Sequence, residues 1–485
     1  MRLLIFIIIC TAGCISQGTS QPISVYTTNP HYLEYKGKPV LLITSAEHYG
    51  AVLNLDLDYI TYLNALQQDG MNYTRIFTGV YIENSESFGI EKNTLAPLKN
   101  RVITPWARSN ETGYYHGGNK FDLSKWDSAY FTRLKDFLAK AYEKDIIVEI
   151  TLFSSIYRDD HWQFSPLHPD NNINGTDNID RKYANTLQNE NHIRFQEAMV
   201  RKIVKEVNAF DNVFFEIQNE PWSDQPGIDD PVHTTNEKPV DHWSGNATPA
   251  SQASLDWQKT IAAFVVDEEK NLTKKHLIAQ NYTNFRYPVL DVDPNISIMN
   301  FHYAWPEAVY LNYAHNKVIN FDESGFSGDL DETYRIQAWN FMLAGGGVFN
   351  NLDYSFVPGQ ENGDFMANSP GRGSKALRKQ LKFLREFLEG FNFSEMWPDP
   401  SFSTYVTGAH SRALINSGKE YSIYFYNGGK CQINYDVPQG TYHIKWIKPA
   451  SGKVIDEKTE SHSGGPFKLS SPEFESDICL SIKLK

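Results

Sequence analysis

Two glutamates, Glu220 and Glu323, stand in settings that suit paired acid and base chemistry. Each lies at the end of a run of apolar, β-branched and aromatic residues, VFFEIQNEPW (213–222) and KVINFDESGF (317–326). A proline or a glycine follows almost at once, so each glutamate is predicted to lie where a strand passes into a loop. Two such carboxyl groups can act as nucleophile and proton donor, although either motif alone also occurs by chance at structural positions.

The segments around the two glutamates repeat a helix-then-strand order. Segment 130–155 has apolar residues at helical spacing and continues as a nearly unbroken apolar strand, and 194–220 repeats this order and ends at Glu220. With the opening strand at 38–46, eight strands are predicted, and Glu220 and Glu323 fall on the fourth and the seventh. This pattern predicts an α/β fold, a (β/α)8 TIM barrel, whose catalytic groups lie at the carboxyl ends of its strands.

Three predicted connections, 80–125, 156–192 and 222–252, are long and rich in aromatic residues. Long loops in compact domains are usually functional. Aromatic faces can stack on the C–H faces of sugar rings, while neighbouring polar side chains bind the hydroxyls. Trp106 and Trp222 are examples, and the alternative is that such tryptophans only hold the loops in place.

With these two glutamate motifs and this strand order, positions 30–390 resemble the cellulase-like families of glycoside hydrolase clan A, which are retaining enzymes on (β/α)8 barrels. In that clan an Asn-Glu pair ends the fourth strand and a glutamate ends the seventh, and these positions match Asn219 with Glu220, and Glu323. The resemblance implies that Glu323 is the nucleophile and Glu220 the acid/base, roughly 5 to 5.5 Å apart, and that Asn219 binds the sugar's 2-hydroxyl. We expect the pKa of Glu220 to be raised by its neighbour's charge and by burial.

Two further positions of the clan are matched on the second and sixth strands. The clan carries an arginine that contacts the nucleophile, matched by Arg75, and a histidine or tyrosine on the sixth strand, matched by His302 or Tyr303. The chain departs from the clan's pattern where the seventh-strand motif reads Glu-Ser-Gly instead of Glu-aromatic-Gly, and where 349–356 lacks a tryptophan often found on the eighth strand. The chain is similar to bacterial polysaccharide-degrading proteins that pair such a barrel with a small C-terminal β-domain, and the sugar and its linkage stay open.

Other side chains near the predicted strand ends are candidate sugar ligands. Glu149 and Glu216 lie inside predicted strands, where an unpaired charge is costly, so we expect them to have structural partners such as Arg75. No His/Cys cluster has zinc spacing and no glycine-rich phosphate loop follows a strand, so we expect neither a metal nor a cofactor. The candidate ligands are Glu47, His48, Trp222, Trp305, Asn351 and Asp353.

The N-terminus predicts export from the cytoplasm. Arg2 and the apolar run 3–10 form a secretory signal that is too short to span a membrane. The residues from Thr11 to Cys14 resemble a bacterial lipobox, which predicts a periplasmic or outer-membrane lipoprotein attached to the membrane through a lipidated Cys14. The alternative is an ordinary cleaved signal and a secreted protein.

Three segments are predicted: a leader and tether at 1–22, the barrel at 23–394, and a C-terminal β-sandwich at 395–485, where short alternating strands are separated by glycine-rich turns. We expect the sandwich to be a structural domain packed on the barrel. Its two cysteines, Cys431 and Cys479, could form a disulfide or be buried free thiols. A net charge of −13 with no basic stripe argues against nucleic acid as a partner, and leaves carbohydrate as the expected one.

Two rival interpretations stay open on sequence alone. A non-catalytic surface carbohydrate-binding protein could keep the barrel and the aromatic loops, although it gains nothing from two close carboxylates, which repel each other. A polysaccharide lyase or an inverting hydrolase is the other, and inversion needs roughly 6.5 to 9.5 Å between the carboxyl groups. For a hydrolase, the three long loops favour an enclosed pocket and action at chain ends.

Overall fold

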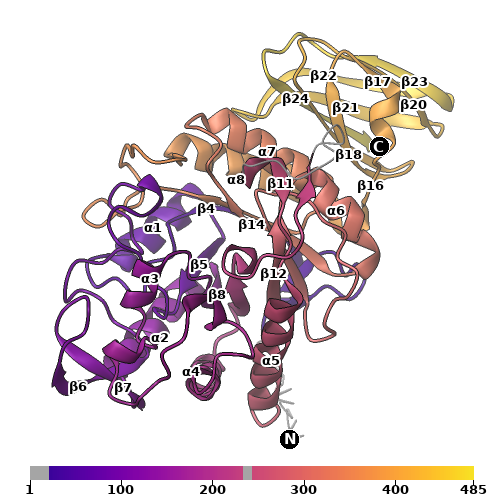
Figure 1. Cartoon of the computed structure of the whole chain (residues 1–485). Helices are drawn as coiled ribbons and strands as arrows, with labels where there is room; N and C mark the ends of the chain where they lie inside the picture. The colour runs from indigo at the N-terminus through magenta and orange to yellow at the C-terminus, as the bar shows by residue number, and fades with distance from the viewer. Residues whose placement is uncertain (1–20, 233–242) are drawn as a thin grey trace, which may run out of the picture.

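Eight parallel strands form the centre of the N-terminal part of the protein (Figure 1). They follow the order β4-β15-β14-β13-β12-β9-β8-β5, and the two end strands β4 and β5 contact each other, so the sheet is a nearly closed barrel. The predicted (β/α)8 barrel is therefore confirmed. In chain order the strands are β4 (Leu42–Ala46), β5 (Tyr73–Phe77), β8 (Ile147–Ser154), β9 (Val213–Asn219), β12 (Ile278–Asn284), β13 (Ile298–His302), β14 (Val318–Ser324) and β15 (Val348–Leu352).

The computed structural model describes residues 21–232 and 243–485. The predicted lipid-bearing Cys14 and most of the leader lie outside the described residues. Within the two described ranges, we find no helix that combines the length and the apolar character needed to cross a membrane.

Helices pack around the barrel because each has one apolar face and a defined start. In α4 the residues from Phe195 to Val207 that are buried recur at helical spacing. The carboxylate of Asp58 caps α1 by accepting from the backbone N–H groups of Ile60 and Thr61, and Asp127 caps α2 in the same way. The helices are α1 (Tyr59–Asp69), α2 (Ser128–Tyr142), α3 (Asp159–Phe164), α4 (His192–Val207), α5 (Gln252–Glu269), α6 (Pro306–Asn312), α7 (Asp331–Leu343) and α8 (Lys375–Glu389).

The long loops are held in place by their own aromatic residues. The connection after β5 contains a hairpin of β6 (Trp106–Thr112) and β7 (Asn119–Trp126), in which Trp106 is buried. Trp162 in α3 is buried as well. For these two tryptophans the alternative stated above holds, because neither of them lines the pocket described below. Trp222 differs, since it reaches the pocket described below.

The C-terminal part consists of antiparallel strands in two sheets, with a separate hydrophobic core between them. It packs on the barrel: the ring of Trp339 in α7 stacks on Tyr424, with centroids 5.0 Å apart, and Arg335 Nε donates to Asp477 Oδ2 over 2.8 Å. The first sheet has the order β16-β18-β19-β24-β21-β22 and the second β17-β20-β23. The strands are β16 (Trp397–Pro398), β17 (Val406–Thr407), β18 (His410–Asn416), β19 (Glu420–Tyr426), β20 (Gln432–Val437), β21 (Gly440–Lys448), β22 (Lys453–His462), β23 (Gly465–Ser470) and β24 (Asp477–Leu484).

Both cysteines of this C-terminal part, Cys431 and Cys479, are free and buried. Cys479 lies in β24 with its thiol facing the backbone carbonyl of Ile447. Of the two alternatives left open by the sequence, the structure shows the buried thiols.

Candidate active site

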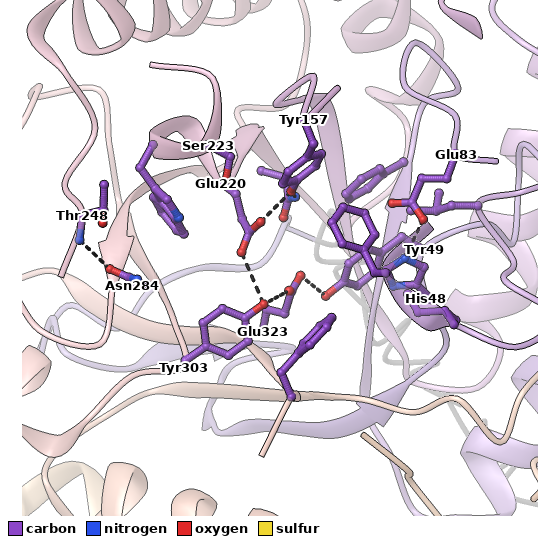
Figure 2. Close-up of a pocket in the computed structure, with 17 residues that line it drawn as sticks. His48, Tyr49, Glu83, Tyr157, Glu220, Ser223, Thr248, Asn284, Tyr303 and Glu323 are labelled. Carbon is purple, nitrogen blue, oxygen red and sulfur yellow. Dashed lines mark hydrogen bonds and ion pairs between the residues drawn. The ribbon is translucent and has the colours of Figure 1, made fainter. Parts of the chain in front are cut away.

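A pocket opens at the carboxyl ends of the barrel strands, with a volume of about 360 Å³. Figure 2 shows Glu220 and Glu323 at its centre, with Tyr157 and Tyr303 beside them. The carboxyl end of a parallel barrel is where catalytic groups gather in this fold. The lining residues are His48, Tyr49, Phe77, Glu83, Phe88, Ile90, Leu95, Tyr157, Asn219, Glu220, Trp222, Ser223, Thr248, Asn284, Tyr303, Glu323 and Phe326.

Glu323, on β14, is held by three donors from three other parts of the barrel. Tyr49 Oη donates to its Oε2 over 2.9 Å and Tyr303 Oη donates to its Oε1 over 2.8 Å. Arg75 Nη1 approaches Oε2 to 3.5 Å. Two hydroxyls and a guanidinium stabilise a carboxylate anion, and they fix its orientation toward the pocket.

Glu220 follows β9 and begins the short turn at Pro221–Ser223, with a left-handed backbone (φ 47°). Tyr157 Oη donates to its Oε2 over 2.6 Å, and His302 Nδ1 lies 3.0 Å from its Oε1. Burial alone would raise the pKa of Glu220, but the hydrogen bond and the charge of His302 outweigh it and lower the pKa below its ordinary value. The expectation of a raised pKa for Glu220 is therefore wrong.

His302 is the cause of that correction. Burial lowers its pKa, but the neighbouring charges of Asp322 and Glu323 raise it well above the ordinary value of histidine. Its Nε2 lies 3.2 Å from Asp322 Oδ2, on the side of the ring away from Glu220. The raised pKa expected for Glu220 took into account burial and the charge of Glu323, but not the positive charge of His302.

The two glutamates are close enough to act on one bond. A carboxylate oxygen of Glu220, one of Glu323 and a ring nitrogen of His302 all lie within 4.8 Å of one another. Tyr303 Oη bridges the pair, at 3.4 Å from Glu220 and 2.8 Å from Glu323. Both carboxylates therefore reach the same part of the pocket, where they can act on one substrate bond.

Arg75 lies beneath the pocket, fully buried, and connects the site to the barrel interior. Its Nε donates to Glu216 Oε2 over 2.9 Å and its Nη2 to Asn219 Oδ1 over 2.8 Å. Burial raises the pKa of Glu216, but Arg75 and Thr151 outweigh it and lower the pKa below its usual range. Arg75 thus stabilises a buried carboxylate and orients Asn219 at the same time.

Two buried acids near Arg75 behave in the opposite way. Burial, followed by the charge of Glu216, raises the pKa of Glu149 well above its usual range. Burial also raises the pKa of Asp322 to about 6, against the opposing charges of His302 and Arg75. The pKa values of neighbouring carboxyl groups in the interior are therefore shifted in opposite directions, with Arg75 as their main counter-ion.

Two groups of side chains have donor sets that could hold a metal ion, one around each end of His302. They share His302, and every carboxylate in them already accepts hydrogen bonds from protein donors, including Arg75 and Tyr303. We therefore assign both groups to the hydrogen-bond network of the site. The groups are Glu216 with His302 and Asp322, and Glu220 with His302 and Glu323.

Comparison with known proteins gives the fold a context. No family model and no curated protein matches the sequence. In structure, the chain is similar to a glycoside hydrolase family 5 protein from Bacteroides vulgatus (TM-score 0.59, 13% identity, 95% of this chain and 93% of that one). A second Bacteroides vulgatus protein, named as a candidate glycoside hydrolase, gives a TM-score of 0.61 at 14% identity over 97% and 83% of the two chains.

A third structure, named only as a glycoside hydrolase, gives a TM-score of 0.57 at 13% identity and covers 96% of this chain and 97% of that one. The chain has the fold of these glycoside hydrolases. The coverage includes both the barrel and the C-terminal strands. At this identity the likeness concerns architecture, and the chemistry has to be argued from the site itself.

The structure brings together six of the residues selected from sequence. Asn219, Trp222, Tyr303 and His48 line the pocket with the two glutamates. Arg75 and His302 lie directly behind it, in contact with Glu323 and Glu220. The six are Arg75, His48, Asn219, Trp222, His302 and Tyr303.

Four other selected residues do not line the pocket. The carboxylate of Glu47 accepts from the backbone N–H groups of Gly50 and Ala51, so it closes a turn. Asp353 is turned toward Arg378 of α8 and accepts from Ser45 Oγ over 2.8 Å. The remaining two also have partners within the protein: Asn351 bonds to Ser45 and Ser324, and Trp305 packs on Phe285 with centroids 5.9 Å apart.

Several pocket residues were not selected from sequence. Tyr49 directly follows the selected His48, so its position after the first strand was a usable signal. Tyr157, Glu83 and Phe88 come from long loops, which periodicity does not place. Their common feature is visible only in three dimensions.

Left-handed backbone is concentrated at this pocket. A non-glycine residue in that region costs about 1 kcal/mol or more and persists where the surroundings enforce it. Such strain gathers at functional sites, and here it occurs at four of the aromatic residues that line the pocket and at Glu220 itself. The pocket residues concerned are Tyr49 (φ 62°), Phe88 (φ 54°), Glu220 (φ 47°), Tyr303 (φ 50°) and Phe326 (φ 55°).

The contact between His302 and Glu220 leads to a test by pH. In His302→Asn the cation is lost, so the pKa of Glu220 is expected to rise by about one unit or more. If Glu220 must be protonated for a reaction, the rate falls as pH rises through its pKa, and the variant's alkaline limb of kcat/KM shifts upward. A pH–rate profile measures this, with His410→Asn, exposed at the start of β18 in the C-terminal domain, as the control that leaves the limb in place. If the alkaline limb of His302→Asn is not shifted, the group whose titration produces that limb is not Glu220.

Proposed function

We propose that this protein is a retaining glycoside hydrolase that uses Glu323 as nucleophile and Glu220 as acid/base. The single observation that carries the proposal is the pair of carboxylate oxygens within 4.8 Å of each other in a pocket at the carboxyl end of the barrel. Two carboxylates this close repel each other, and a protein keeps such a pair where the chemistry needs both. The fold shared with glycoside hydrolases supports the same conclusion.

In the first step, Glu323 attacks the anomeric carbon and forms a glycosyl ester. The glycosidic C–O bond breaks, and the proton of Glu220 passes to the departing oxygen. Arg75, Tyr49 and Tyr303 hold the attacking carboxylate in place. Since these donors are already in position, little reorganisation is needed as the charge on Glu323 changes.

In the second step, water attacks the same carbon and Glu220 accepts its proton. The ester bond breaks, Glu323 is released as a carboxylate, and the sugar leaves with its original anomeric configuration. His302 and Tyr157, which contact Glu220, keep its carboxyl group directed at the bond throughout. Because His302 lowers the pKa of Glu220, the rate is expected to rise as the pH falls toward that pKa.

The substrate is a poly- or oligosaccharide outside the cytoplasm, in keeping with the predicted N-terminal signal. Asn219, oriented by Arg75, is placed to bind the sugar's 2-hydroxyl. Trp222, in the turn that begins at Glu220, lines the pocket and offers an aromatic surface to the leaving group. The long loops around the pocket support attack at chain ends, which product analysis by chromatography would distinguish from internal cleavage.

A panel of aryl glycosides and of plant and microbial polysaccharides tests the proposal. Purified protein is expected to release reducing sugar from at least one of them, and proton NMR of the first product is expected to show the anomer of the substrate. A first product of inverted configuration would contradict the retaining mechanism. Binding without release from any substrate would instead favour a carbohydrate-binding protein on the same scaffold.

A further inference from the structure

Glu83 is a third carboxylate in the pocket, and the two-glutamate mechanism does not use it. Figure 2 shows Glu83 and His48 at one end of the pocket, Thr248 and Asn284 at the other, and the two catalytic glutamates between them. Glu83 comes from the loop after β5 and is 3% exposed. A buried acid at the end of a binding pocket requires its own explanation.

Glu83 forms a pair with His48 that the protein itself supports. Tyr81 Oη donates to Glu83 Oε1 over 3.1 Å, and Asn93 Nδ2 donates to Oε2. His48 Nε2 faces the same oxygen at 3.4 Å, while its Nδ1 has no hydrogen-bond partner in the part of the chain that the structure describes. Burial opposes the ionised form of both groups, but their mutual attraction prevails: it lowers the pKa of Glu83 and raises that of His48.

The pair lines a pocket whose apolar wall includes Phe77, Phe88, Ile90 and Leu95. Burying an ion pair among apolar groups costs more than it returns unless the geometry is very favourable, and apolar side chains would seal this end more cheaply. Phe88 in this wall also holds a strained left-handed backbone. Both features are typical of a surface shaped for a ligand.

This end of the pocket belongs to the sugar that is attacked. Tyr49, the neighbour of His48 in sequence, donates to the proposed nucleophile Glu323. Ser223, in the turn that begins at the acid/base Glu220, lies on the Glu220 side of the pocket and away from Glu83 (Figure 2). The leaving group departs on the side of the acid/base. The attacked sugar therefore extends from Glu323 toward Glu83.

We infer that Glu83 and His48 bind hydroxyls of the attacked sugar and make the pocket selective for uncharged sugars over uronic acids. A carboxylate accepts from sugar hydroxyls and a histidine can donate to them. A sugar carboxylate placed at this end would meet Glu83, and no lysine or arginine among the described residues lines the pocket to balance it. The inference rests on the proposed function, since that function decides which end holds the attacked sugar.

Matched pairs of methyl glycosides and methyl uronides test the selectivity by isothermal titration calorimetry. The pairs are the glucoside with the glucuronide, the galactoside with the galacturonide, and the mannoside with the mannuronide. The wild-type protein is expected to bind the neutral member of at least one pair about 10-fold or more tighter than its uronide. In Glu83→Gln this ratio is expected to fall about 10-fold, because the negative charge that repels the uronide is gone.

Glu86→Gln is the matched control, because Glu86 is exposed on the same loop. The ratio of its affinities for the neutral glycoside and the uronide is expected to equal that of the wild type. Tighter binding of uronides by the wild type, or no binding of any neutral member, overturns the inference, and these measurements do not depend on the folding of a variant. A ratio that Glu83→Gln leaves unchanged overturns it as well. If the protein binds neutral sugars selectively but hydrolyses no substrate, the selectivity is supported and the proposed hydrolase function is contradicted. If it hydrolyses substrates and prefers uronides, the hydrolase function is supported and the selectivity is contradicted.

Discussion

Glu323→Gln is expected to lower kcat by about 10⁵-fold or more on every substrate that the wild type hydrolyses, because an amide cannot form the glycosyl ester. Glutamine keeps the size of the side chain. Its amide oxygen can accept from one of the two tyrosines, Tyr49 or Tyr303, and its NH₂ group can donate to the hydroxyl oxygen of the other, so the fold is expected to persist. Single-turnover measurements with an aryl glycoside give the rate. Glu111→Gln, on the exposed β6 hairpin, is the control and should match the wild type.

Glu220→Gln is expected to behave differently, and the difference separates the two roles. A loss of about 10² to 10⁴-fold is expected on substrates whose leaving group needs a proton, and a smaller loss on aryl glycosides with acidic phenols. Azide, which needs no general base, should restore turnover in Glu220→Gln by forming a glycosyl azide of retained configuration. Equal losses on all leaving groups would contradict the role of Glu220 as acid/base. Azide rescue in Glu323→Gln alone would indicate that the two glutamates have the opposite roles.

The main elements of this site could be predicted because they depend on strand order. Counting apolar runs assigns Glu220 and Glu323 to the fourth and seventh strands. In the structure Glu220 directly follows the fourth barrel strand and Glu323 lies on the seventh, with Arg75 on the second and His302 on the sixth. In a barrel, each strand end has a fixed angular position around the axis. Strand number therefore carries information about which side chains meet.

Side-chain direction and electrostatics could not be predicted in the same way. Asp353 follows the eighth strand, but its carboxylate turns to Arg378 on α8, a partner 25 residues away that no local pattern links to it. The pKa of Glu220 depends on whether His302 is charged, and that depends in turn on Asp322 on the next strand. Such a chain of three coupled groups follows from distances, which the sequence does not supply.

The positions of loop residues could not be predicted either. Glu83 and Phe88 lie in a connection that the sequence shows to be long, but periodicity does not predict the path of such a loop. Their position depends on long-range contacts, such as the bond from Ser87 Oγ to the ring of His161 and the bond from Asn84 to Asp160. The residues that decide which sugar fits are therefore those that sequence patterns locate least well.

Arg75→Met is expected to destabilise the fold by about 3 to 5 kcal/mol at pH 7, because it leaves buried carboxylates without their main counter-ion. Arg75 is fully buried and contacts Glu216, Asp322 and Glu323. Chemical denaturation followed by tryptophan fluorescence measures the loss. Arg101→Met is the control, since Arg101 pairs with Asp56 at the exposed surface, where an ion pair contributes about 1 kcal/mol or less.

The dependence of this loss on pH identifies its cause. The folded-state pKa of Glu216 is lowered, so its pairing with Arg75 stabilises the wild type above the unfolded-state pKa, about 4.3, and this contribution fades as pH falls through the lower folded value. Asp322, with its pKa raised to about 6, acts in the opposite sense and favours the fold less as pH rises from about 4 to 6. The destabilisation in Arg75→Met should therefore be largest at neutral pH and shrink toward pH 4, as the orphaned carboxylates take up protons. A loss of equal size at pH 7 and pH 4 would mean that Arg75 acts by filling space, and Arg75→Lys, which restores the charge without the planar fork, should then recover no stability.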